Sequence, residues 1–372
     1  MFRKIKGQDH TIDLLRKAIE NKRVSQAYLF HGSDGVGKFM TALYFGMAVN
    51  CYGLTELRPC GVCASCHKFL SLEHPDFVHV FPTPVLNLSA DGEIKKSESL
   101  KQYQAYIQNK LNTPWADFFF KEAVEIRKEN ISMLIKRLEL TIHEAEYRIV
   151  IIEDADQMNI PTANAFLKTL EEPPPNTIII MLTERLQMIL PTIISRTQPI
   201  YFKPLSRGVI EAILTEQFET PAAIAKTAAR ISAGNLKSAI RIASETGSTA
   251  RDWAFELVEM AAKQDDMSFL TSLEKNKDNK TKSRVEDLLK YIRIIVGDIA
   301  LLAISNGDEV SNVDKLEFLE AVAEQAPGIG EATHEYLLDL EDLSRKIDGN
   351  VNLNLVLINL FIKTKKLLNR TL

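Results

Sequence analysis

The sequence predicts an α/β domain built on a parallel sheet, followed by regions made only of helices. Five short apolar runs are strand-like, and most are separated by segments with helical periodicity. A glycine-rich stretch directly follows the first run, and the strand signal disappears after about Pro204. Alternating strands and helices favour a parallel sheet covered by helices on both faces.

The predicted strands are residues 27–30 (AYLF), 77–81 (FVHVF), 149–152 (IVII), 178–182 (IIIML) and 200–202 (IYF). A helix is predicted over 39–50, directly after the glycine-rich stretch. Another is predicted where Ile131, Leu134, Ile135 and Leu138 form one apolar face. The polar segment 86–115 is expected to be an irregular surface insertion.

The remainder of the chain predicts helices over 209–217, 222–232, 237–244 and 284–304. The pattern changes near 247–249, so we expect three domains, at 1–203, 204–247 and 248–372. Near the C-terminus, Val351, Leu355 and Ile358 are expected to form a dense apolar helix face that packs in a bundle and in part against other subunits.

Length and charge narrow the class of protein. A chain of 372 residues is too long for one simple core. With 45 Lys and Arg against 49 Asp and Glu, its formal charge is −4, so any DNA contact is expected to be local or shared with partners. The N-terminus lacks the apolar run of a signal peptide, and Asp298 interrupts the apolar segment 291–304. We expect a cytoplasmic protein with no membrane contact.

The stretch GSDGVGKFM, residues 32–40, resembles a phosphate-binding loop of the pattern GxxxxGK. Gly32, Gly35, Gly37 and Lys38 are its candidate phosphate-binding residues, because backbone N–H groups at a helix N-terminus and a lysine attract phosphate oxygens. The next residue should be Ser or Thr, whose hydroxyl binds magnesium, but Phe39 stands there. The alternative is a glycine-rich turn that happens to contain a lysine.

The strand 149–152 is followed by Glu153 and Asp154. Hydrolytic enzymes of this kind have the opposite order, Asp-Glu, in which the carboxylates hold magnesium and orient water. Because catalysis tolerates errors of about 1 Å poorly, the reversed carboxylates do not predict efficient hydrolysis. We expect that ATP or ADP can bind and that magnesium binding is impaired. The alternative is a solvated acidic strand end.

All four cysteines lie close together, and Cys51, Cys60, Cys63 and Cys66 have the spacing C-x8-C-x2-C-x2-C. Four thiolates from one short segment can enclose a structural zinc ion. An iron–sulfur cluster is the competing interpretation, but ferredoxin motifs continue with a further Cys-Pro, whereas this fourth cysteine lies upstream. His67 is expected to be a bystander.

Four blocks together resemble the clamp-loader branch of the AAA+ ATPases: VSQAYLFHGSDGVGK, VIIEDADQMNIPTANAFLKTLEEPPPNTIIIMLTE, LPTIISRTQPIYFKPL and ISAGNLKSAI. The resemblance covers most of residues 1–244. It implies an AAA+ domain with a zinc module, a helical lid and a helical collar domain. It also implies that Thr183 is a sensor of the terminal phosphate, and that Lys237 replaces a sensor arginine.

The same resemblance implies that Arg196, after Ser195 in the sequence SRT, is an arginine finger that reaches the ATP site of a neighbouring subunit. The family has Ser-Arg-Cys there, and Thr197 replaces the cysteine. An arginine fork is suited to neutralising charge on a phosphoryl group, although a lone exposed arginine is more often only solvated or salt-bridged.

The implied function is that of a clamp-loader subunit of bacterial DNA polymerase III, a stator with little ATPase activity of its own. Its partners would be the delta and gamma/tau subunits, the sliding clamp and primer-template DNA, and polymerase chemistry would belong to the assembly. The rival hypotheses are an active motor ATPase of gamma/tau type and a stand-alone zinc-containing DNA-binding or repair protein.

Overall fold

The computed structural model describes residues 2–85, 94, 97–115, 118, 120–122, 124–244, 249–275, 281–304, 307, 309–349 and 351–369. The chain folds as two compact units. The first is Met1–Ile210 with Ala233–Ser238, and the second is Glu211–Ser232 with Ala239–Leu372. The three-domain division expected from the sequence stays a prediction.

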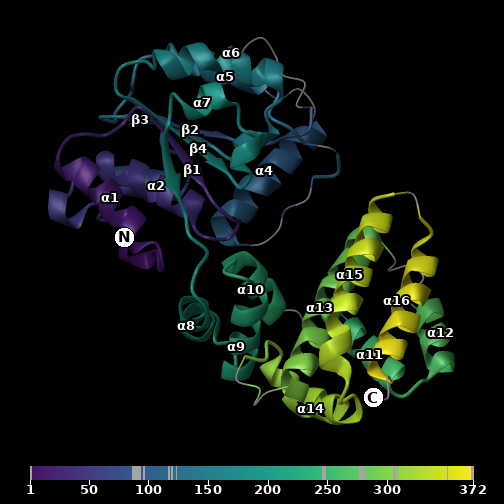
Figure 1. The fold of residues 1–372 in the computed structure, drawn as a ribbon. Helices are drawn as coiled ribbons and strands as arrows, with labels where there is room; N and C mark the ends of the chain where they lie inside the picture. The colour runs from purple at the N-terminus through teal and green to yellow at the C-terminus, as the bar shows by residue number, and fades with distance from the viewer. Residues whose placement is uncertain are drawn as a thin grey trace. The chain divides into compact units, whose positions relative to one another are not determined.

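A five-stranded sheet organises the first unit (Figure 1). Its strands are β1 (Ala27–His31), β2 (Phe77–Val80), β3 (Arg148–Ile152), β4 (Thr177–Thr183) and β5 (Gln198–Tyr201). Their order is β2-β3-β4-β1-β5, and every paired strand is parallel to its neighbour. All five predicted strands and the parallel sheet are confirmed.

Helices cover both faces of this sheet because successive strand side chains point to opposite faces. Ile149 and Ile151 pack in one core with α1 (Asp9–Glu20) and α2 (Lys38–Val49). Val150 and Ile152 pack in the other core, with α5 (Lys128–Leu138) and α6 (Ile160–Glu171). The helices predicted after the glycine-rich stretch and around Ile131 are thereby confirmed.

Part of the expected irregular insertion is a helix, α4 (Ser97–Asn112), so that expectation is wrong for this part. The segment is polar because α4 buries no residue completely, and its low hydrophobicity concealed its periodicity. Residues 86–93, 95 and 96 lie outside the described part of the chain. The unit also contains α3 (Ala64–Leu70), α7 (Pro191–Ile194) and four short 3₁₀ turns: η1 (Phe2–Lys4), η2 (Thr55–Leu57), η3 (Ala155–Gln157) and η4 (Leu186–Met188).

The second unit is helical throughout the residues described, as predicted. Helices α8 (Arg207–Phe218) and α10 (Leu236–Ser244) cross the boundary between units. The others are α9 (Ala222–Ile231), α11 (Ala250–Ala262), α12 (Asp266–Lys275), α13 (Lys282–Ile304), α14 (Leu316–Gln325), α15 (Ile329–Asp348), α16 (Leu353–Leu368) and the turn η6 (Val313–Lys315). Asp298 in α13 is buried and accepts hydrogen bonds from the backbone of Ser311 and Asn312. Among the described residues, no helix is long and apolar enough to span a membrane.

The face expected near the C-terminus is not the one buried within this chain, and its expected contact with other subunits stays a prediction. Val351 and Leu355 are exposed and Ile358 is half-buried, whereas Val356 and Leu360 are buried. Because α16 is apolar on most sides, sequence periodicity alone did not fix which side faces the core.

The expected change of pattern at 247–249 lies partly outside the described residues, since 245–248 are not described; Thr249 caps α11 by accepting from the backbone N–H of Asp252.

Candidate functional site

The phosphate-loop motif lies at the carboxyl edge of the sheet, between β1 and α2. Gly37 ends the loop with φ of 94°, a left-handed conformation that favours glycine. Gly35 has φ of 65°, and an added Cβ would stand 2.1 Å from the side-chain oxygen of Asn235. The glycines are therefore required by backbone shape and by the close approach of residues 233–238.

Lys38 is turned toward the loop itself. Its ammonium group donates hydrogen bonds to the carbonyl oxygens of Gly32 and Ser33, both at 2.6 Å. Burial lowers the pKa of Lys38, and this is opposed by the carboxylates of Glu184, Asp34 and others nearby. The predicted sensor Lys237 also lies beside the loop, with its Nζ 3.4 Å from the carboxylate of the loop residue Asp34.

A second cluster at this edge surrounds Asp156. The buried Thr183 hydroxyl donates to Asp156 Oδ1 at 2.6 Å, and Arg185 donates to Oδ2 through Nε and Nη2, at 2.8 and 2.6 Å. Asp154 follows β3 with a left-handed φ of 46°. Although the residue is exposed, limited hydration of its carboxyl and the negative charges of Glu153 and Asp156 raise its pKa to about 6.

The Glu153 carboxylate has three side-chain partners. Oε2 accepts from Lys110 Nζ at 2.6 Å, while Oε1 lies 2.6 Å from His79 Nε2 and 3.1 Å from the Tyr106 hydroxyl. Burial acts to raise the pKa of Glu153, but the Lys110 ammonium and His79 outweigh it and lower the pKa to about 2. Glu153 is thus an ionised group with its charge already balanced.

The structure brings every predicted nucleotide-pocket residue to this edge, together with groups that sequence reasoning missed: His79, Tyr106, Lys110, Asp156 and Glu184. One signal was available for two of them. Tyr103, Tyr106 and Lys110 recur at i, i+3 and i+7, which places them on one side of a helix. His79 also lies in a predicted strand, but nothing in its spacing points to Glu153.

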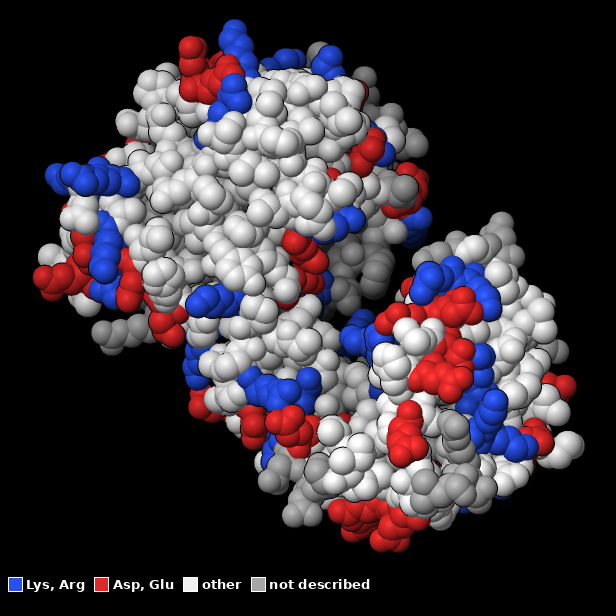
Figure 2. All heavy atoms as spheres, in the orientation of Figure 1, with Lys and Arg blue, Asp and Glu red and all other residues white. Residues whose placement is uncertain are grey.

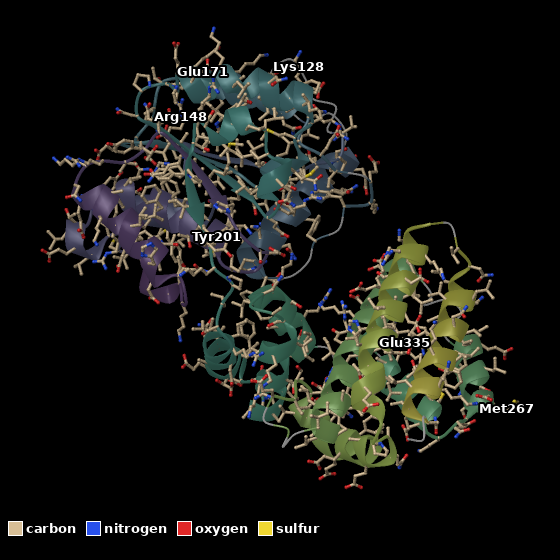
Figure 3. The ribbon with its side chains drawn as sticks, viewed as in Figure 1. Lys128, Arg148, Glu171, Tyr201, Met267 and Glu335 are labelled. Atoms are coloured by element: carbon tan, nitrogen blue, oxygen red, sulfur yellow. The ribbon has the colours of Figure 1, made fainter. Side chains whose placement is uncertain are left out.

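Arg196 lies at the opposite, amino edge. It precedes β5, where Gln198 pairs with Tyr28 near the start of β1, whereas the phosphate loop follows the other end of β1. Glu171, which contacts Arg196, and Tyr201, the last residue of β5, are labelled at opposite ends of the unit in Figure 3. Because the four-residue β5 spans about 13 Å, Arg196 does not reach its own loop.

The Arg196 side chain is 33% exposed, and its partner Glu171 is 47% exposed. Nε donates to Glu171 Oε1 at 2.8 Å, and Nη1 donates to the Thr192 carbonyl oxygen at 2.8 Å. Ser195 is also exposed, and its hydroxyl donates to the same carbonyl oxygen. These partners hold the guanidinium at the surface without enclosing it.

The four cysteines form a compact cluster after α2, with all four Sγ atoms within 4.8 Å of one another. This suits a tetrahedral metal site, in which sulfurs bound to zinc lie about 3.8 Å apart. Backbone N–H groups of Gly53 and Cys60 point at Cys51 Sγ, and that of Cys66 points at Cys63 Sγ. The N–H of Val62 lowers the pKa of Cys60 to about 6, while burial raises the pKa of Cys66. The spacing of the four sulfur atoms therefore fits a metal ion held by these cysteines.

Comparison with known proteins identifies the class. Residues 7–206 match the family model described as DNA polymerase III, delta subunit. This match covers more than half of the chain, so the chain belongs to that family, a group of clamp-loader proteins of DNA replication.

Within the family, the chain is 28% identical to DNA polymerase III subunit delta' of Bacillus subtilis over 348 residues, 93% of this chain and 92% of that protein. Among the clamp-loader proteins, the same sequence motifs predict a delta-prime subunit, and this match over nearly the whole chain confirms that relationship. The chain is also 29% identical to the gamma/tau subunit of Mycobacterium tuberculosis H37Rv over 213 residues, 57% of this chain and 30% of that protein. A solved gamma-subunit-related protein of Thermotoga maritima has 16% identity and a TM-score of 0.44, covering 95% of this chain and 98% of that one.

Proposed function

We propose that this chain is the stator of a DNA polymerase III clamp loader and lends Arg196 to the ATP site of a neighbouring subunit. Its own loop, formed by Gly32, Gly35, Gly37 and Lys38, would bind ATP or ADP without efficient hydrolysis. Asp154, Thr183 and Lys237 stand beside that loop, and Ser195 helps to orient the finger. The three parts of the chain act as AAA+ domain, lid and collar.

The position of Arg196 carries this proposal. An arginine that served its own nucleotide would have to stand at the carboxyl edge, where Lys38 lies. Arg196 instead stands at the amino edge, exposed, with an exposed carboxylate as its ion-pair partner. Exposed ion pairs contribute only about 0–1 kcal/mol, so Arg196 can exchange Glu171 for a phosphate group at little cost.

The test is reconstitution with the other loader subunits, comparing wild type with Arg196→Ala. Because an arginine finger contributes about 10³–10⁵-fold at the site it serves, turnover of ATP stimulated by clamp and DNA should fall by at least about tenfold. Arg23→Ala is a matched control, because Arg23 is also exposed and precedes a strand of the sheet. Unchanged turnover with Arg196→Ala would remove the proposed finger.

The gamma/tau-type alternative requires an active pocket. Phe39 lacks the hydroxyl that binds magnesium, and the Glu153 carboxylate is already ion-paired. The isolated chain should therefore hydrolyse ATP no faster than its own Lys38→Ala variant. Rapid turnover that depends on Lys38 would favour the motor instead.

We further propose that Cys51, Cys60, Cys63 and Cys66 hold structural zinc, supported by their sulfur geometry. Elemental analysis of purified protein should find one zinc ion per chain and no iron. Four thiolates leave no open coordination position, so the metal would stabilise the module and take no part in catalysis.

The stand-alone DNA-binding alternative predicts a broad basic surface. On the face drawn in Figure 2, the described acidic and basic side chains are interspersed. We propose that contacts with the sliding clamp and primer-template DNA occur within the assembly, in the cytoplasm. Tight, strongly salt-dependent DNA binding by the isolated chain would contradict this.

A further inference from the structure

One side chain contacts both positions at which a P-loop ATPase holds its metal. The ammonium group of Lys110 lies 4.2 Å from the centre of the Phe39 ring and 2.6 Å from Glu153 Oε2. Position 39 follows the phosphate-loop lysine, where a hydroxyl normally binds magnesium, and position 153 ends the strand that normally supplies the metal-binding aspartate. Lys110 therefore lies between the two protein groups on which a metal would depend.

The groups at this point do not fit a divalent cation. Phe39 offers an aromatic face and no oxygen, and such a face attracts an ammonium group. The Glu153 carboxylate accepts from Lys110 and contacts His79 and Tyr106, so its charge is balanced and both of its oxygens already have partners. A metal ion here would have to displace a cation that is tethered to the chain.

We propose that Lys110 replaces the divalent metal of this pocket, so that the chain binds adenine nucleotide without magnesium. Phe39 and Lys110 would then together replace the usual hydroxyl and metal ion, because the phenyl ring gives the ammonium group a surface to pack on. This inference rests on the proposed retention of nucleotide binding, and it assigns a role to α4, the helix that the sequence predicted as irregular.

Aromatic packing holds α4 in place. The Tyr106 ring stacks on Phe81 with centroids 4.1 Å apart and lies 5.6 Å from Phe120, and Tyr103 also stacks on Phe81. One turn after Tyr106, the Lys110 side chain is only 15% exposed and its partner Glu153 only 11%. The ammonium group is thus fixed by a packed helix and not by a flexible surface chain.

The first measurement uses the unmodified protein. Calorimetric titration with ADP, in buffer containing either magnesium or EDTA, should give dissociation constants that agree within about twofold. Tightening by magnesium of about tenfold or more would overturn the proposal. The same protein, titrated with Mn²⁺ alone and followed by the Mn²⁺ resonance, should retain no ion in the pocket. Retained Mn²⁺ that is lost in Glu153→Gln would also overturn it.

The second measurement builds the missing site. Phe39→Thr with Lys110→Met restores the hydroxyl and removes the ammonium group, so magnesium should tighten ADP binding by about tenfold or more. Lys101→Met, an exposed lysine on the same helix, should leave ADP binding insensitive to magnesium. A folded double variant that stays insensitive to magnesium, judged by its circular dichroism, would count against the proposal.

Failure of the proposed nucleotide binding gives a different result. If the wild-type chain binds no ADP in either buffer, that part of the proposed function is wrong. The Mn²⁺ titrations of wild type and Lys110→Met still judge Lys110, since only the variant should gain Mn²⁺ binding.

Discussion

The two edges of the sheet differ in how far the carboxylates of their ion pairs are exposed to water. At the carboxyl edge, charged groups are satisfied within the chain: Lys110 by Glu153, Arg185 by Asp156, and Lys38 by carbonyl groups of its own loop. At the amino edge, Arg196 is exposed and its partner Glu171 is more exposed still. At the carboxyl edge these charged groups are thus paired within the chain, while the amino edge presents a cation at the surface.

The ion pairs at the two edges differ in the free energy needed to separate them. A group paired in a poorly hydrated site leaves an uncompensated charge when its partner departs, which costs about 3–5 kcal/mol. A group in a surface pair loses about 0–1 kcal/mol. Of the Lys110, Arg185 and Arg196 pairs, that of Arg196 has the most exposed carboxylate and should therefore be the least costly to break.

The largest expected effect concerns the proposed zinc site, which adjoins a core helix: α2 begins at the phosphate loop and ends just before Cys51. Cys63→Ser preserves the hydrogen-bond acceptor that caps α3 but removes a thiolate. It should lower the free energy of unfolding by about 4 kcal/mol and abolish stoichiometric zinc. Denaturant unfolding and metal analysis would check this. His67→Ala should retain the metal, and a stable zinc-free Cys63→Ser protein would contradict the proposed site.

The next largest effect is a loss of stability at low pH that depends on Glu153. Its pKa is lowered from 4.5 to about 2 in the folded protein, so the stabilisation is fully present above pH 4.5 and is lost as the pH falls toward 2. The shift corresponds to about 3 kcal/mol. Unfolding free energies measured from pH 6 to pH 3 should fall less steeply in Glu153→Gln. Parallel curves for the two proteins would show that Glu153 is not the ionised partner of Lys110.

A smaller loss is expected at the other carboxyl-edge pair. The Asp156 side chain is 4% exposed and accepts from both Thr183 and Arg185. Asp156→Asn should lower the free energy of unfolding by about 2 kcal/mol, because it weakens charge-assisted bonds in a poorly hydrated site. Chemical denaturation at neutral pH would measure this loss of stability. A loss smaller than that caused by Glu171→Gln would reverse the comparison.

The smallest effect is expected from Glu171→Gln, the matching change at the amino edge. Removing this ion pair should lower the free energy of unfolding by less than about 0.5 kcal/mol, because both of its members are exposed. In the assembled loader this variant should keep the ATP turnover that Arg196→Ala loses. A cost of several kcal/mol, or a loss of turnover equal to that of Arg196→Ala, would mean that Glu171 positions the finger.

Local patterns were sufficient for much of the fold. Alternating side chains such as Ile149, Val150 and Ile151 are buried on opposite faces, so the strands were apparent as apolar runs. The closely spaced cysteines predicted a cluster because a short segment keeps its ligands near one another. The 97–112 helix was missed because its stabilising contacts are aromatic rings far away in sequence, such as Phe81.

By itself, then, the amino-acid sequence determined the parallel sheet, the phosphate-loop motif with its missing hydroxyl, the cluster of four cysteines and the family. Those features depend on neighbours along the chain or on fixed spacing. Tertiary structure alone decided that Lys110 meets Glu153 across 43 residues and that Arg196 stands at the far edge from its own loop. Partners so distant are chosen by the packing of whole helices and strands, which no local pattern of residues encodes.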